Sequence, residues 1–274
     1  MNKTMSISMS MPLIFHAVGE WHRGAVRVAR VACTRRIVPE VERAIDAAWE
    51  HVVTRRPGVK LFDGPMIRLE SYRAAPDLLD LSVSPTSYRP FLGTNLTDPT
   101  LADRFGADVL ANPIGVSTAL LTRDGFLMMG RRSAWVAYYP NRMHPFAGAL
   151  ELRDGSTDVF DDVSRELEEE LGLSRDDVAE IVCTGLVSDV SLRQPELIFR
   201  ATSTRTREQI EAGLDKDEHT ACVAIATTEH DVERAIRDPQ ITPVGMAALG
   251  LWGRHAFGEN WFGSSPAEVI GLKP

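Results

Sequence analysis

The chain has 274 residues, of which 44% are apolar and 25% charged, and its 30 basic and 38 acidic side chains give a formal net charge of −8. This composition is typical of a soluble globular protein and excludes an intrinsically disordered chain. The acidic balance argues against a nucleic-acid-binding protein, because such proteins depend on Lys and Arg to contact phosphates. No window approaches the roughly 18 uninterrupted apolar residues of a membrane span, so we expect neither nucleic acid nor a membrane as a partner.

The cysteines and the N-terminus indicate where the protein works. Cys33, Cys183 and Cys222 are far apart and form no CxxC pair, which argues against a disulfide framework and against a structural zinc site. The apolar patch at residues 12–18 is too short for a signal peptide. We therefore expect a cytoplasmic protein.

Residues 1–109 mix strand and helix patterns. Alternating Val-rich sequence predicts a strand over 25–36, and apolar residues at helical spacing predict an amphipathic helix over 38–54. The other predicted elements are strands at 66–72 and 78–83, a loop at 87–95 and a short helix at 100–109. We predict that residues 1–109 form a small α+β domain.

The pattern changes after Pro113. Two strands at 115–122 and 126–132 are joined by an Arg-Asp-Gly turn, which predicts a hairpin. The later elements are strands at 181–187, 196–201 and 222–226 and helices at 158–171, 206–213, 230–237 and from residue 243. Strands interleaved with helices predict an α/β layered sheet, and we assign residues 110–274 to this second domain.

The helix predicted over 158–171 is the most informative segment. Its apolar stripe consists of Val159, Val163, Leu167 and Leu171, and the acidic residues beside the stripe are Asp162, Glu166, Glu169 and Glu170. Like charges four residues apart repel, and partial burial increases the repulsion unless the carboxylates are protonated or bind a cation. Hard oxygen ligands at this density suit Mg²⁺ or Mn²⁺. The alternative is a solvated acidic face.

This helix also carries a family resemblance. Residues 165–173, RELEEELGL, resemble the second half of the Nudix box, R-E-apolar-x-E-E-x-G-apolar. The first half is irregular, because Thr157 stands where the family has Glu and Glu151 stands where it has Gly. Gly148 resembles the displaced box glycine, followed by an insertion.

Four further stretches resemble the UDP-glucose pyrophosphatase branch of the Nudix hydrolases, which has an additional N-terminal domain. They are LFDGPMIRL (61–69), TSYRPFLGTN (86–95), NPIGVSTAL (112–120) and FLMMGRRS (126–133). The resemblance implies a Nudix α/β/α sandwich with a mixed sheet. It also implies a metal-dependent hydrolase that splits UDP-glucose or UDP-galactose into UMP and a sugar 1-phosphate. Another nucleoside diphosphate derivative as substrate (ADP-ribose or a dinucleotide) and a non-catalytic nucleotide-sugar-binding protein remain alternatives.

The resemblance further implies the roles of the acidic residues. Glu166, Glu169 and Glu170 would bind Mg²⁺ or Mn²⁺, and Arg165 would orient them through charge-assisted hydrogen bonds. We expect Glu196 as a further metal ligand and Glu218 as the base, although a solvent-exposed Glu without such a role is an equally open reading of each.

Candidate substrate contacts lie on both sides of the proposed domain boundary. Arg131 and Arg132 suit a phosphate because a guanidinium pairs with it bidentately, the alternative being a solvated strand end. Tyr88 and Asn95 offer a ring and an amide for a uracil or sugar, or they pack in the seam between the domains. Gly148 joins this set as the box glycine. The histidines show no metal-binding spacing, and we assign them no role.

Overall fold

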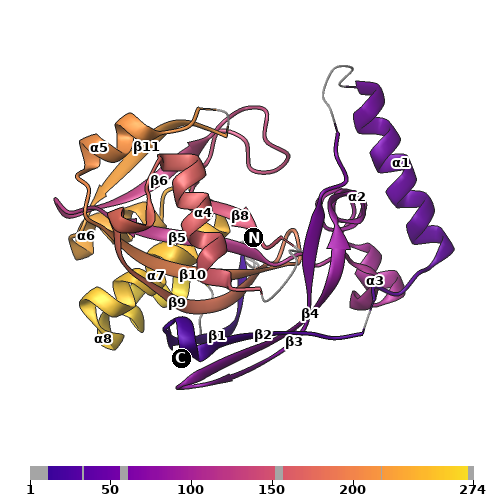
Figure 1. Ribbon diagram of the computed structural model, residues 1–274, viewed down its shortest axis with the longest axis horizontal. Coiled ribbons are helices and arrows are strands. Elements are labelled where there is room, and N and C mark those ends of the chain that lie inside the picture. The colour runs from indigo at the N-terminus through magenta and orange to yellow at the C-terminus, as the bar shows by residue number, and fades with distance from the viewer. Residues whose placement is uncertain (1–11, 33, 56–60, 152–156, 217, 271–274) are drawn as a thin grey trace, which may run out of the picture.

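The structure is a computed structural model that describes residues 12–32, 34–55, 61–151, 157–216 and 218–270. A large and a small β-sheet lie side by side, and α1 lies on the outer side of the small one (Figure 1). Among the described helices, none combines the length and the apolar composition needed to cross a membrane. Cys183 and Cys222 are free thiols, and Cys33 lies outside the described residues.

The large sheet has the strand order β1-β9-β10-β5-β6-β11, with β7 paired to β6 and β8 paired to β5. Its strands are β1 (Leu13–Trp21), β5 (Gly115–Leu121), β6 (Phe126–Arg132), β7 (Met143–His144), β8 (Phe146–Ala149), β9 (Val178–Asp189), β10 (Gln194–Ser203) and β11 (His219–Ala226). Strands β10 and β5 run parallel, whereas the other pairs are antiparallel. The sheet is therefore mixed, as predicted.

Helices cover both faces of the large sheet. On one face, α4 (Val159–Leu171) buries its apolar stripe in a core that includes Leu197 and Phe199 of β10. On the other face, α6 (Glu229–Ile236) and α7 (Pro243–Phe257) share a second core with Ile198. Successive side chains of a strand point to opposite faces, so β10 contributes to both cores. The predicted α/β/α sandwich is confirmed. The remaining helices around this domain are α5 (Arg207–Gly213), α8 (Glu259–Phe262) and α9 (Ser265–Ile270).

The small sheet has the order β2-β4-β3 and lies against the first core. Its strands are β2 (Val26–Arg30), β3 (Pro65–Ala75) and β4 (Leu78–Ser87), and the helices beside it are α1 (Pro39–Arg55), α2 (Tyr88–Phe91) and α3 (Leu101–Phe105). Leu79, Leu81 and Val83 of β4 belong to the core of the large domain. The two sheets are therefore held together by shared apolar packing.

Several elements differ from their predictions. Residues 87–95, predicted as a loop, form α2 and a π-helical turn over Leu92–Leu96, in which Thr94 Oγ1 donates to the carbonyl of Pro90. Strand β2 is shorter than predicted. Residues 13–21, for which the sequence predicted no element, form β1 at the edge of the large sheet. The boundary between residues 109 and 110 stays a prediction.

Candidate active site

The local sequence fixes both ends of α4. Asp158 caps the N-terminus, its Oδ1 accepting a hydrogen bond of 2.9 Å from the backbone N–H of Phe160. Gly172 ends the helix with a φ of 65°, a left-handed conformation that favours glycine. Because the apolar stripe is buried, the acidic residues beside it are held along the edge of the sheet.

Arg165 lies among the carboxylates of α4. Its Nη2 is 2.6 Å from Glu166 Oε1 and 3.5 Å from Asp162 Oδ1, and its Nη1 is 2.8 Å from Glu169 Oε2. The Arg165 side chain is only 20% exposed, so these contacts are screened less than a surface pair would be. One guanidinium thereby fixes the positions of three acidic side chains.

Within this acidic set, Glu170 is buried and Glu166 is partly buried. Burial and the negative charges of Glu218 and Glu166 raise the pKa of Glu170 well above its usual value. Burial also raises the pKa of Glu166 to about 7. Glu169, in contrast, is largely exposed. Bringing a cation to this edge of α4 would relieve the cost of ionising the carboxylates of Glu170 and Glu166.

The two oxygens of Glu170 differ in their contacts. Oε2 accepts a hydrogen bond of 3.2 Å from the backbone N–H of Ala147. Oε1 is buried without a hydrogen-bond partner among the described residues. A buried carboxylate oxygen without a donor is costly, so this atom is suited to bind an ion.

Gly148 on β8 provides the space for Glu166. A Cβ atom built at this position would lie 1.9 Å from Glu166 Oε1 and 2.1 Å from its Cδ. The backbone of β8 and the carboxylate of α4 therefore approach each other more closely than any larger residue would allow.

Two adjoining cavities run along this edge of the molecule. One, of about 370 Å³, is lined by Arg165, Glu166 and Glu169 of α4, and the other, of about 310 Å³, by Arg132, Tyr138 and Gln194. Both are lined by Met66, Tyr88, Ala147, Gly148, Ala149 and Glu218. We call the pair the α4 cleft. Since Met66 and Tyr88 come from the small sheet and α2, both parts of the molecule form its walls.

Arg132 lies at the end of the α4 cleft away from the helix. It is 5% exposed, and its guanidinium carbon lies 4.6 Å from the centre of the Tyr138 ring. Its Nε donates a hydrogen bond of 3.2 Å to the carbonyl of Tyr138, and burial raises the pKa of that tyrosine to about 12. The cleft thus has a cationic end and an acidic end.

The chain is similar to known proteins along most of its length. No family model matches the chain. The uridine diphosphate glucose pyrophosphatase of Mus musculus is 28% identical over 261 residues, which cover 81% of this chain and 82% of that protein. The protein of the same name from Homo sapiens is 29% identical over 262 residues, covering 80% of this chain and 84% of that protein. The resemblance stated from the sequence is confirmed. Over about four fifths of its length, this chain is therefore similar to uridine diphosphate glucose pyrophosphatases.

Among solved structures, the MutT protein of Methanosarcina mazei is 15% identical, with a TM-score of 0.37, and covers 53% of this chain and 94% of that chain. A hydrolase of the Nudix family from Clostridium perfringens is 13% identical, with a TM-score of 0.33, and covers 52% of this chain and 97% of that chain.

The structure brings most, but not all, of the predicted site residues to the α4 cleft. Those that line it are Tyr88, Arg132, Gly148, Arg165, Glu166, Glu169 and Glu218. Glu170 lies behind the wall formed by Ala147, with which it is hydrogen-bonded. Arg131 lies outside the cleft, where its Nη1 donates to the carbonyl of Asn141 at 3.0 Å. Arg132 therefore lines the cleft and Arg131 does not, and a phosphate contact by either residue stays a prediction.

Asn95 does not reach the cleft. It is fully buried, its Nδ2 donates to the carbonyl of Leu192 at 2.9 Å, and its Oδ1 accepts from the backbone N–H of Asn112 at 3.0 Å. These bonds join the π-helical turn to the large sheet, because Asn112 precedes β5 and Leu192 follows β9. Asn95 therefore packs in the seam between the two parts of the molecule, and a substrate contact by this residue stays a prediction.

Glu196 lies within the sheet. It is 6% exposed, accepts a hydrogen bond from Ser117 Oγ on β5, and burial raises its pKa to about 7. It does not line either described cavity of the cleft. In the parts of the chain that the structure describes, no three His, Cys, Asp or Glu side chains are already gathered closely enough to hold a metal ion. A cation would therefore have to draw the carboxylates together, and the ligand role of Glu196 stays a prediction.

Sequence reasoning missed His219. It is 1% exposed, and its Nδ1 lies 3.8 Å from Glu170 Oε1. Burial lowers the pKa of His219 to about 4, so its ring is neutral at pH 7. No sequence signal could have found it, since β11 and α4 come together only through the sheet.

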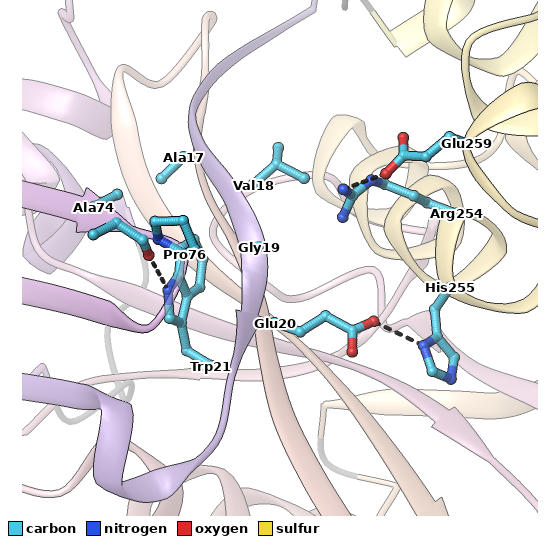
Figure 2. Close-up of a pocket in the computed structure, with 11 residues that line it drawn as sticks. Ala17, Val18, Gly19, Glu20, Trp21, Ala74, Pro76, Arg254, His255 and Glu259 are labelled. Atoms are coloured by element: carbon cyan, nitrogen blue, oxygen red, sulfur yellow. Dashed lines mark hydrogen bonds and ion pairs between the residues drawn. The ribbon is translucent and has the colours of Figure 1, made fainter.

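A groove of about 620 Å³ lies elsewhere, between β1, the end of β3 and the C-terminal helices (Figure 2). Its charged side chains are paired with each other. Glu20 Oε1 is 2.7 Å from His255 Nδ1, and Arg254 pairs with Glu259. The acidic edge of α4 does not contribute to this groove.

Proposed function

We propose that this protein is a Nudix hydrolase that cleaves the pyrophosphate bond of a nucleoside diphosphate sugar, with UDP-glucose or UDP-galactose giving UMP and a sugar 1-phosphate. The observation that carries the proposal is the α4 cleft, where the carboxylates of Glu166 and Glu169 and the buried guanidinium of Arg132 lie at opposite ends of one cavity system. Such a site is suited to a substrate with a charged centre and an uncharged ring. The names of the mouse and human relatives support uridine diphosphate glucose as that substrate.

We propose Mg²⁺ or Mn²⁺ as the cofactor, with Glu166, Glu169 and Glu170 as ligands and Glu196 as a further one. The buried, unpaired Oε1 of Glu170 fits this role, because carboxylate oxygens are the ligands that these ions prefer. When bound, a divalent cation offsets the charge of the pyrophosphate and lowers the pKa of a coordinated water. We also propose that the protein is located in the cytoplasm.

The side chains of the cleft would then have different roles in binding and hydrolysis. Arg165 holds Glu166 and Glu169 in position through the ion pairs described above. Arg132 binds a phosphate oxygen of the substrate with its guanidinium, which is suited to bidentate contacts. Tyr88 lies between the two cavities and packs against the base or the sugar. Glu218, which lines both, accepts the proton of the attacking water.

A substrate screen tests this proposal. We would assay UDP-glucose, UDP-galactose, ADP-ribose and a dinucleotide with Mg²⁺ and measure the nucleoside monophosphate released. Glu170→Gln should lower the rate by about 10² or more, because it removes an anionic ligand while keeping the side-chain shape. Glu168→Gln is the matched control, since Glu168 is exposed on the same helix and lines neither cavity.

Two outcomes would contradict the proposal. If UMP is released from neither UDP-sugar while ADP-ribose or the dinucleotide is cleaved, the substrate assignment is wrong. If a UDP-sugar binds tightly but is not turned over in saturating Mg²⁺, the protein is a nucleotide-sugar-binding protein.

A further inference from the structure

We propose that His219 is a positioning residue for Glu170: with a cation bound, its Nδ1–H donates a hydrogen bond to Glu170 Oε1 and holds that carboxylate in place. The inference rests on the proposed function, because it requires a cation at the acidic edge of α4. It assigns a role to a histidine whose sequence context has no metal-binding pattern.

The fold fixes where the His219 ring lies. His219 is the first residue of β11 and is paired with Arg132 of β6. Gly130 on β6 leaves the space that the ring occupies, since a Cβ there would lie 2.1 Å from the ring Cδ2. The Phe146 ring contacts it edge-on, with centroids 5.4 Å apart. The Cδ2 edge therefore faces β6, while Nδ1 is the nitrogen near Glu170.

The facing polar atoms of His219 and Glu170 lack hydrogen-bond partners. In the described residues, neither ring nitrogen of His219 has one, and the same holds for Glu170 Oε1. Buried polar groups in folded proteins are nearly always hydrogen-bonded. The distance of 3.8 Å between Nδ1 and Oε1 exceeds that of a hydrogen bond. A small movement of the Glu170 carboxylate, of the kind that cation binding would cause, closes it.

The proposed bond completes the support of Glu170. Its Oε2 already accepts from the backbone N–H of Ala147, so a bond from His219 would fix both oxygens. Each carboxylate oxygen has two lone pairs, and one on each remains for a cation. Hydrogen-bond donors behind a ligand orient it and tune its affinity for metals.

Three variants of His219 separate positioning from packing. In His219→Asn the amide nitrogen lies near the place of Nδ1, in His219→Gln it lies near that of Nε2, and His219→Phe keeps a ring without a donor. His230→Asn, at an exposed position on α6, is the control. We would titrate each protein with Mn²⁺, following free Mn²⁺ by electron paramagnetic resonance, and record melting temperatures without the ion.

We expect the Phe and Gln variants to bind Mn²⁺ about 10- to 100-fold more weakly than wild type, and the Asn variant to stay within about threefold. Equal losses in the Asn and Gln variants, or unchanged binding in the folded Phe variant, would overturn the inference. If the Phe variant does not fold, the Asn and Gln variants decide. If wild type cleaves a UDP-sugar and the variants bind Mn²⁺ equally, only this inference fails. If wild type binds no divalent cation, the proposed function fails with it.

Discussion

Gly148→Ala tests the close approach of β8 and α4. The new Cβ would lie 1.9 Å from Glu166 Oε1, whereas ordinary contact begins at 3.4 Å. The carboxylate must therefore retreat by about 1.5 Å, and it can do so because it is the end of a flexible side chain. A misplacement of about 1 Å in a catalytic group lowers the rate about 10²-fold, which corresponds to about 2.7 kcal/mol of transition-state stabilisation.

The expected result is a loss of at least about 10²-fold in kcat/KM for UMP release, with the free energy of unfolding changed by less than about 1 kcal/mol. Gly24→Ala is the control, because a Cβ at Gly24 meets nothing within 4 Å. In a Glu166→Gln background the alanine should cause little further loss, since both changes act on one group. A Gly148→Ala protein with kcat/KM within about threefold of wild type would refute the reasoning.

Three other predictions concern single residues. Arg165→Lys should lower kcat/KM about tenfold, because an ammonium group cannot pair with Asp162, Glu166 and Glu169 in the same geometry. The control is Arg175→Lys, at an exposed ion pair, which should leave kcat/KM unchanged. Asn95→Ala should lower the free energy of unfolding by about 3 kcal/mol in urea titrations, because the buried groups that bond to Asn95 lose their partners. A large rise in KM with no loss of stability would instead indicate that Asn95 contacts the substrate. Burial and the charge of Arg132 lower the pKa of His144 well below 6.5. As the pH falls below 6.5, the unfolded state therefore binds a proton at His144 that the folded state does not bind. The free energy of unfolding decreases as a result. Between about pH 7.5 and pH 5.5, His144→Gln should therefore lose about 1.4 kcal/mol less unfolding free energy than wild type, and equal losses in the two proteins would contradict this.

The sequence was most informative where one local pattern decides the structure. The four-residue spacing of Val159, Val163, Leu167 and Leu171, with an Asp before it and a Gly after it, predicts α4 and both of its ends. The same spacing places the carboxylates beside the buried stripe. A periodic element with caps depends little on the rest of the fold, so it can be predicted from its own residues.

Features that depend on distant contacts were not predicted. The inward residues of β1 do not alternate, because register shifts fall between Phe15 and Ala17 and between Val18 and Trp21, so no period of two is visible in the sequence. The sequence left both a substrate contact and packing in the seam open for Asn95, because the bonds that bury it come from residues distant in the chain. His219 was missed because only the pairing of β11 with β6 brings it to α4.

Strand β1 imposes an order on how the chain can assemble. Leu13 pairs with Asp189 and Trp21 with Cys183, so β1 leaves the ribosome long before β9 and cannot join the sheet until β9 has been synthesised. The small sheet can form earlier, since its three strands are encoded between β1 and β5. A nascent chain therefore passes through a stage in which the apolar side chains of β1 have no sheet to join. Trp21, which becomes fully buried, offers a fluorescence signal for the moment at which that stage ends.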